Sequence, residues 1–252
     1  MQVTVLPALE DNYMYLISDD NTKYAAVIDP VSPDLVLEEV NKQGLSLQSI
    51  LTTHHHWDHD GGNEKIDAIA RQAHYVFEIG TLKVKCMFTP CHTSGHMCYL
   101  VSSDSKPSAL FSGDTLFVGG CGRFFEGTAE QMYTALCEVL ASLSDDTKVF
   151  CGHEYTISNL KFAHKVDPLN QDVIKKLEWA KERRKNHQPT IPSTIGQDFW
   201  TQCITIPPFR GKGSYENNDE CCCISSHKTH IFCQTRKFSF IRFLRNFCCN
   251  LI

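Results

Sequence analysis

The sequence lacks the features that would direct a chain into a membrane or through one. None of its apolar runs approaches the length needed to span a bilayer. The opening stretch, MQVTVLPALEDNYMYLI, has no basic cluster and meets Glu10 and Asp11 early, unlike a signal or transit peptide. We therefore expect a cytoplasmic protein without a membrane span.

The chain also has no excess of basic over acidic residues. The chain has 24 Lys and Arg residues against 29 Asp and Glu residues, which gives a net charge of −5. Without a basic field, nucleic acid is not an expected partner. With 252 residues, 42% hydrophobic and 21% charged, the chain can form one large core or two smaller domains.

The chain has 13 cysteines but lacks the paired cysteine spacing of a structural zinc site. Some are scattered singly through the first 160 residues, at positions 86, 91, 98, 121, 137 and 151; the others crowd the end, at positions 203, 221, 222, 223, 233, 248 and 249. Without a secretory signal we expect reduced thiols. Neither set has the spacing of a structural zinc site.

Strand and helix patterns alternate over the first 200 residues. Strands are predicted at 2–7, 13–18, 24–29, 47–53, 82–88, 98–102, 109–112 and 148–151. Helices are predicted at 32–44, 128–143, 156–165 and 170–185. Ser32 and Gly44 suit the ends of the first helix, and Thr128 with Gln131 can form a capping box. Mixed strands and helices indicate sheet layers flanked by helices, with a helical end.

The character of the chain changes near residue 201. The remainder, 201–252, is rich in cysteine, basic after Glu220, and has no clean period of either kind. A basic, aromatic segment on a membrane surface is one interpretation. We favour a divergent, disordered tail that does not pack in a specific way.

Histidines are concentrated in the stretch TTHHHWDHDGGN, which follows a predicted strand. His54, His56, Asp58 and His59 lie there within six positions. In extended backbone His54 and His56 emerge on one side, and the next two residues lie at the turn. Imidazole and carboxylate groups bind divalent transition metals, and this stretch holds too many donors for one tetrahedral ion. The pattern favours two adjacent metals over a surface histidine run.

Three later motifs offer the remaining ligands. His92 lies in TPCHTSGH, Asp114 in FSGDTLF and His153 in VFCGHEYT, each at or near the end of a predicted strand. Singly, each has an ordinary explanation, such as a loop histidine or a turn aspartate. Together they complete two metal shells and a bridging carboxylate.

These four motifs, in this order, resemble the motif series of the metallo-β-lactamase superfamily. The strings LPALEDNYMYLI, CGRFFEGTAEQM, GHEYTISNLKFA and PTIPST further resemble hydroxyacylglutathione hydrolase (glyoxalase II) or its close paralogue. The resemblance covers residues 1–65 and about 80–199. It implies an α+β fold: an αββα sandwich over 1–155, shortened around 66–80, and a partial helical substrate-binding domain over 156–200.

The resemblance implies a ligand set for each of two divalent cations: His54, His56 and His92 for one, and Asp58, His59 and His153 for the other. Asp114 would bridge the cations together with water or hydroxide, and Asp58 would also act in catalysis by orienting the nucleophile. Zn²⁺ is expected, with Fe or Mn as alternatives. His55 and His96 are not ligands in this pattern, and Asp29 is expected to orient a ligand histidine.

The implied reaction is hydrolysis of S-lactoylglutathione to glutathione and D-lactate, a step in methylglyoxal detoxification, by a monomer. The expected substrate-binding residues are Arg123, Phe124, Phe125, Tyr155, Arg210 and Lys212. Core packing is the alternative for Phe124, and a solvated charge for Arg123. At Phe125 the family more usually has tyrosine, so a hydrogen bond of about 1 kcal/mol is lost.

Two further departures leave other functions open. The segment 66–80 is shorter than in the family, and similarity stops near Phe199, so Arg210 and Lys212 are substitutes for the family's basic residues. The alternatives are another hydrolase of the same fold, a persulfide dioxygenase, which typically uses one iron, or a catalytically impaired isoform that binds metal.

Overall fold

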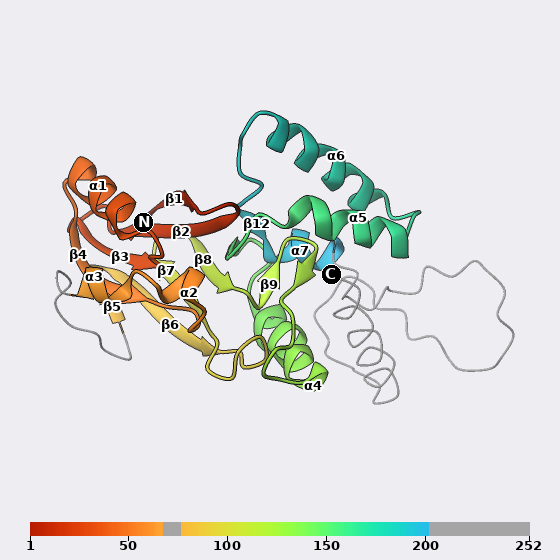
Figure 1. Cartoon of the computed structure of the whole chain (residues 1–252), viewed down its shortest axis with the longest axis horizontal. Coiled ribbons are helices and arrows are strands. Elements are labelled where there is room, and N and C mark those ends of the chain that lie inside the picture. Colours follow the sequence, from red (N-terminus) through yellow and green to blue (C-terminus); the bar gives the residue numbers. More distant parts are fainter. Residues whose placement is uncertain (68–76, 202–252) are drawn as a thin grey trace, which may run out of the picture.

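Two β-sheets pack face to face, and helices cover their outer faces, in the computed structural model (Figure 1). The structure describes residues 1–67 and 77–201. Within these ranges no helix combines the length and the apolar character that a membrane crossing requires. The predicted substrate residues Arg210 and Lys212, and the rest of the predicted tail, lie outside the described residues.

The first sheet has four strands in the order β1 (Gln2–Ala8), β2 (Asn12–Ser18), β3 (Tyr24–Ile28) and β4 (Ser46–Leu51). The first three strands are antiparallel, and β4 runs parallel to β3 after the crossover helix α1 (Pro33–Gln43). Gly44 ends α1 with φ +63°, as predicted. Ser32 is the N-cap residue of α1, as predicted, but its side chain makes no capping hydrogen bond.

The second sheet has six strands in the order β12 (Ser193–Thr194), β11 (Lys148–Cys151), β8 (Lys106–Gly113), β7 (Met97–Ser103), β6 (Leu82–Phe88) and β5 (Phe77–Ile79). All neighbouring pairs are antiparallel except β11 and β8. A ribbon of β9 (Leu116–Phe117) and β10 (Gly120–Cys121) follows β8. The short strands β5, β9, β10 and β12 were not predicted, because two or three residues carry no periodic signal.

Apolar side chains fill three layers. The central layer joins the two sheets and includes Tyr15, Ile28, Phe111 and Phe150. Val36 of α1 packs in the cluster on the outer face of the first sheet, and the helix after residue 128 covers the second. This arrangement confirms the predicted αββα sandwich.

The predicted helix 128–143 is not one regular α-helix. It begins as α4 (Ala129–Tyr133), continues as a π-helix (Thr134–Val139) and ends as a 3₁₀ turn (Leu140–Ser142). The Leu140 N–H bonds to the carbonyls of both Ala135 and Leu136, which is how the wider turn closes. The predicted capping box of Thr128 and Gln131 is confirmed.

The helical end is fastened to the sandwich. Helices α5 (Thr156–Val166) and α6 (Gln171–Lys185) lie side by side around a small apolar cluster, and α7 (Ile195–Thr201) follows β12 (Figure 1). The strand β12 extends the second sheet. In addition, the Glu154 carboxylate accepts hydrogen bonds from Tyr13 of β2 and from Thr190. The domain boundary at residue 155 stays a prediction.

Candidate metal centre

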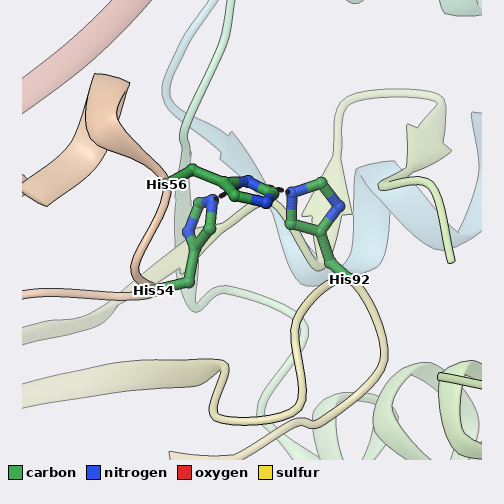
Figure 2. Close-up of side chains that lie close together, drawn as sticks. All are labelled: His54, His56 and His92. Carbon is green, nitrogen blue, oxygen red and sulfur yellow. Dashed lines mark hydrogen bonds between the residues drawn. The ribbon is translucent and has the colours of Figure 1, made fainter. Parts of the chain in front are cut away.

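The donor residues from the sequence motifs converge at one end of the sandwich. His54 and His56 follow β4, while Asp58 and His59 lie in the short helix α2 (Trp57–Asp60). His92, Asp114 and His153 follow β6, β8 and β11 of the other sheet. The side chains form three groups, and within each group the donor atoms all lie within 4.8 Å of one another. The groups are His54, His56 and His92; His54, His59 and Asp114; and Asp58, His59 and His153. Figure 2 shows the first group, with the rings turned toward each other.

Two glycines let the strand ends come this close. A Cβ at Gly113, where φ is +46°, would lie 2.6 Å from Thr53 Oγ1. A Cβ at Gly152 would lie 2.3 Å from Asp114 Oδ1. Both contacts are too short for any other residue, so the motifs SGD and CGH need glycine for packing.

Hydrogen bonds to the outer ring nitrogens fix the two histidines of the second ligand set. The His59 Nδ1 lies 2.9 Å from the buried Asp29 carboxylate, and the His153 Nδ1 lies 2.8 Å from Asp11 Oδ1. Carboxylates accept, so each Nδ1 carries the proton and each Nε2 presents a lone pair to the centre. The structure thus shows Asp29 in contact with a proposed ligand histidine, as its predicted orienting role requires.

Two histidines of the first ligand set, His54 and His92, are oriented in the same way. Thr53 Oγ1 donates to Asp29 at 2.7 Å and therefore accepts from His54 Nδ1 at 3.0 Å. The His92 Nδ1 donates to the Arg123 carbonyl at 2.9 Å. Again, each Nε2 faces inward without a proton.

The inner ring nitrogens lie about as close together as two nitrogens that bind the same cation. His59 Nε2 and His153 Nε2 are 3.2 Å apart, and His54 Nε2 is 3.0 Å from His56 Nδ1. Two nitrogens bound to one tetrahedral cation at about 2.0–2.1 Å would be separated by a similar distance, about 3.4 Å. The donor geometry therefore fits cations held between the rings.

Asp114 lies between the two ligand sets. Its Oδ2 is 3.4 Å from the Nε2 atoms of His92 and His153, and its Oδ1 is 3.5 Å from His59 Nε2. Asp114 is 6% exposed, and among the described residues its Oδ1 has no hydrogen-bond partner. A buried, bare carboxylate oxygen is costly unless a cation neutralises it.

The charges at the centre favour the binding of a cation. Burial opposes ionisation of Asp114, but the surrounding histidines, His153 first, hold its pKa well below the usual range. Against the effect of burial, Asp114 and Asp11 raise the pKa of His153 to about 9. Burial lowers the pKa of His54 and of His92, which keeps these rings neutral and able to bind metal.

Two histidines of the motifs, His55 and His96, lie beside the proposed ligands and make other contacts. His96 is fully buried, accepts a hydrogen bond from the Asp114 N–H at 3.1 Å and stacks on His54. It therefore supports the centre from behind. His55 is exposed and lies 3.3 Å from Glu126.

The predicted substrate residues divide into two groups. Phe125 is 60% exposed, and its ring centroid lies 5.1 Å from that of His92. Tyr155 is 37% exposed and stacks on His153 with a ring-centroid distance of 4.7 Å, and Arg123 is exposed. Phe124 differs, because it is half-buried and packs against the core, the alternative that the sequence left open.

Some supporting residues were not singled out from the sequence. Asp11 holds His153, and Asn12 Nδ2 donates to both the backbone carbonyl and the carboxylate of Asp58 at 3.1 Å. Both residues lie within the string LPALEDNYMYLI, but an Asp-Asn pair at a strand start carries no ligand pattern of its own. Thr53 could have been suspected only from its place beside His54.

Comparison with known proteins agrees with this geometry. Residues 9–81 match the sequence model of the metallo-beta-lactamase superfamily, and 154–202 match that of the hydroxyacylglutathione hydrolase C-terminus. A hydroxyacylglutathione hydrolase-like protein of Gallus gallus is 49% identical over 79% of this chain and 78% of its own. The cytoplasmic hydroxyacylglutathione hydrolase of Arabidopsis thaliana is 45% identical over 80% and 86%. ETHE1 from Myxococcus xanthus, a solved structure, is 32% identical, with a TM-score of 0.53 over 62% of this chain and 76% of its own.

Fold and donor set together support the binding of divalent metal ions. The histidine and carboxylate donors suit several such ions.

Proposed function

Because the chain belongs to the hydroxyacylglutathione hydrolase family, whose members are hydrolases of the metallo-β-lactamase fold, we propose that it hydrolyses S-2-hydroxyacylglutathione thioesters. S-lactoylglutathione is the expected substrate, and glutathione and D-lactate are the products. The reaction would remove methylglyoxal that has reacted with glutathione.

One observation supports the proposal: the buried Asp114 carboxylate lies within 3.5 Å of His92 from the first proposed ligand set and of His59 and His153 from the second. We assign His54, His56 and His92 to one cation, Asp58, His59 and His153 to the other, and Asp114 to both. Zn²⁺ is the ion we expect, with Fe or Mn as alternatives.

When bound, the cations would supply hydroxide at neutral pH and a Lewis acid for the carbonyl oxygen. Asp58 is the catalytic carboxylate in this proposal. Its side chain is 23% exposed, so it faces the opening of the centre and can accept a hydrogen bond from the attacking water. Water oxygen bonds to the thioester carbon, the carbon–sulfur bond breaks, and the glutathione thiolate leaves and takes up a proton.

Exposed side chains at the opening would hold glutathione. Phe125 borders the first ligand set and Tyr155 the second, so a thioester between them would lie over Asp114. The Arg123 guanidinium suits the glutathione carboxylates. Arg210 and Lys212 keep their predicted role in this proposal, although they lie outside the described residues.

The alternatives make different demands on the second ligand set. A persulfide dioxygenase needs one iron, so it would not require Asp58, His59 and His153 to converge. That convergence supports hydrolysis at two metals. A catalytically impaired isoform would bind metal without turnover, which the experiment below distinguishes.

The test is thioester hydrolysis by the purified full chain after loading with Zn²⁺. Loss of the thioester absorbance of S-lactoylglutathione is followed for the wild type, His54→Ala and the control His55→Ala. We expect turnover in the wild type and control, and a loss of at least about 100-fold in His54→Ala, beyond what the loss of an outer partner causes. Full activity in His54→Ala would contradict the proposal, and metal binding without turnover would favour the impaired isoform.

A further inference from the structure

Asn12 stands at the first position of β2 and reaches the second ligand set. It is 5% exposed. Its side-chain Nδ2 donates to the Asp58 carbonyl and to Asp58 Oδ2, both at 3.1 Å. An amide NH₂ has two hydrogens, so one group can satisfy both acceptors. The pair spans 46 positions of the sequence and ties the start of β2 to α2.

We propose that Asn12 is a positioning residue that orients the Asp58 carboxylate and thereby sets the cation affinity of the second ligand set. This inference rests on the proposed ligand role of Asp58. It adds a residue that touches neither cation nor substrate and acts through the carboxylate alone.

Asp58 needs such support more than its neighbours do. Its side chain is 23% exposed, against 1% for His59 and 5% for His153. Packing holds the two histidine rings, whereas the partly exposed Asp58 carboxylate retains rotamer freedom that would be lost when a cation binds. The two bonds from Asn12 fix the backbone and the carboxylate of Asp58 together, so the ligand is ordered before the ion arrives.

The effect should be confined to one ligand set. The first set is held by Thr53 and by the Arg123 carbonyl, which lie on other segments. The Asn12 backbone forms an isolated bridge to His153, and Asp11 holds the His153 ring. A change of the Asn12 side chain leaves both of these contacts in place and removes only the hold on Asp58.

The test measures cation binding without any substrate. Metal-free full chain is titrated with Zn²⁺ against a competing chelator, for the wild type, Asn12→Leu and Asn12→Ala. Leucine keeps the approximate size of the side chain and can neither donate nor ligate. Asn63→Leu is the matched control, because Asn63 Nδ2 donates to Thr52 Oγ1, at the other end of the same loop, and not to Asp58.

We expect the wild type and Asn63→Leu to bind two equivalents. In both Asn12 variants the first equivalent should bind as in the wild type, and the second should bind about 10–100-fold more weakly, as for other outer partners of a metal ligand. Equal weakening of both equivalents would mean that Asn12 serves only the fold, and an unchanged second equivalent would overturn the inference. A wild type that binds two equivalents but leaves S-lactoylglutathione intact would refute the proposed function and not this inference.

Discussion

The two proposed ligand sets of the centre contain the same kinds of donor groups but differ in one support that solvent reaches. In the first set, His54 is held by the buried Thr53 and His92 by the backbone carbonyl of Arg123. In the second set, His153 depends on Asp11, whose side chain is 40% exposed, and Asp58 depends on Asn12. The difference teaches that two neighbouring cation positions need not be equivalent. We expect the second set to bind its cation more weakly.

Asp114→Ala should weaken cation binding by both ligand sets, and so remove the difference between them. It removes the carboxylate that lies 3.4 Å from both His92 and His153. We expect thioester hydrolysis and the affinity for both equivalents of Zn²⁺ to fall by more than about 100-fold, the upper range for outer partners. Metal titration and the thioester assay check this. Asp60→Ala, in the same helix as Asp58, is the control and should leave both quantities unchanged.

Asp29→Asn should weaken both sets by a smaller factor. Asp29 accepts from His59 Nδ1 and, through Thr53 Oγ1, supports His54. Its φ of +50° is tolerated by asparagine, so the backbone is preserved. The carboxylate also accepts from the Thr53 N–H at 2.7 Å, and an amide group, which has one acceptor oxygen, cannot accept all three bonds. We expect both equivalents of Zn²⁺ to bind about 10–100-fold more weakly in a chelator titration. Loss confined to one equivalent would show that Asp29 does not link the sets.

Asp11→Asn tests whether the two ligand sets have separate supports, because it should change cation binding by the second set alone. The asparagine oxygen can still accept from His153 Nδ1, and solvent reaches this position. We therefore expect only the second equivalent to weaken, by at most about 10-fold, the lower range for such partners. The same titration measures it, and a change in the first equivalent would argue against separate supports.

Phe125→Tyr should have the smallest effect, and a favourable one. The ring is 60% exposed beside His92, so an added hydroxyl can reach bound glutathione without displacing packed groups. One hydrogen bond of about 1 kcal/mol would lower KM roughly fivefold with kcat unchanged. Steady-state kinetics check this. The half-buried Phe124→Tyr is the control, and an equal gain there would contradict the placement of Phe125.

That four of the proposed donors converge could be predicted from the sequence, because each follows a strand. Once β4, β6, β8 and β11 are aligned in two packed sheets, their ends must lie at related edges, and His54, His92, Asp114 and His153 meet there. Local patterns also predicted the longer strands, the α1 terminus at Gly44 and the Thr128 capping box. These features depend on residues that are close in sequence.

Apart from Asp29, the supports could not be predicted in this way. Asp11 contacts a residue 142 positions away, and the bonds from Tyr13 and Thr190 to Glu154 exist only after the helical end has docked. The change from α- to π-helix after Tyr133 leaves no sign in the hydrophobic pattern. Such contacts follow from tertiary packing, which no local period encodes.

The central claim is that seven donors from both sheets hold two cations, and metal content tests it most directly. Purified full chain, loaded with Zn²⁺ and freed of loosely bound ions, is compared with Asp58→Ala and with the control Asp60→Ala. We predict about two equivalents in the wild type and in Asp60→Ala, and one in Asp58→Ala. A wild type that holds a single equivalent, or none, would contradict the account.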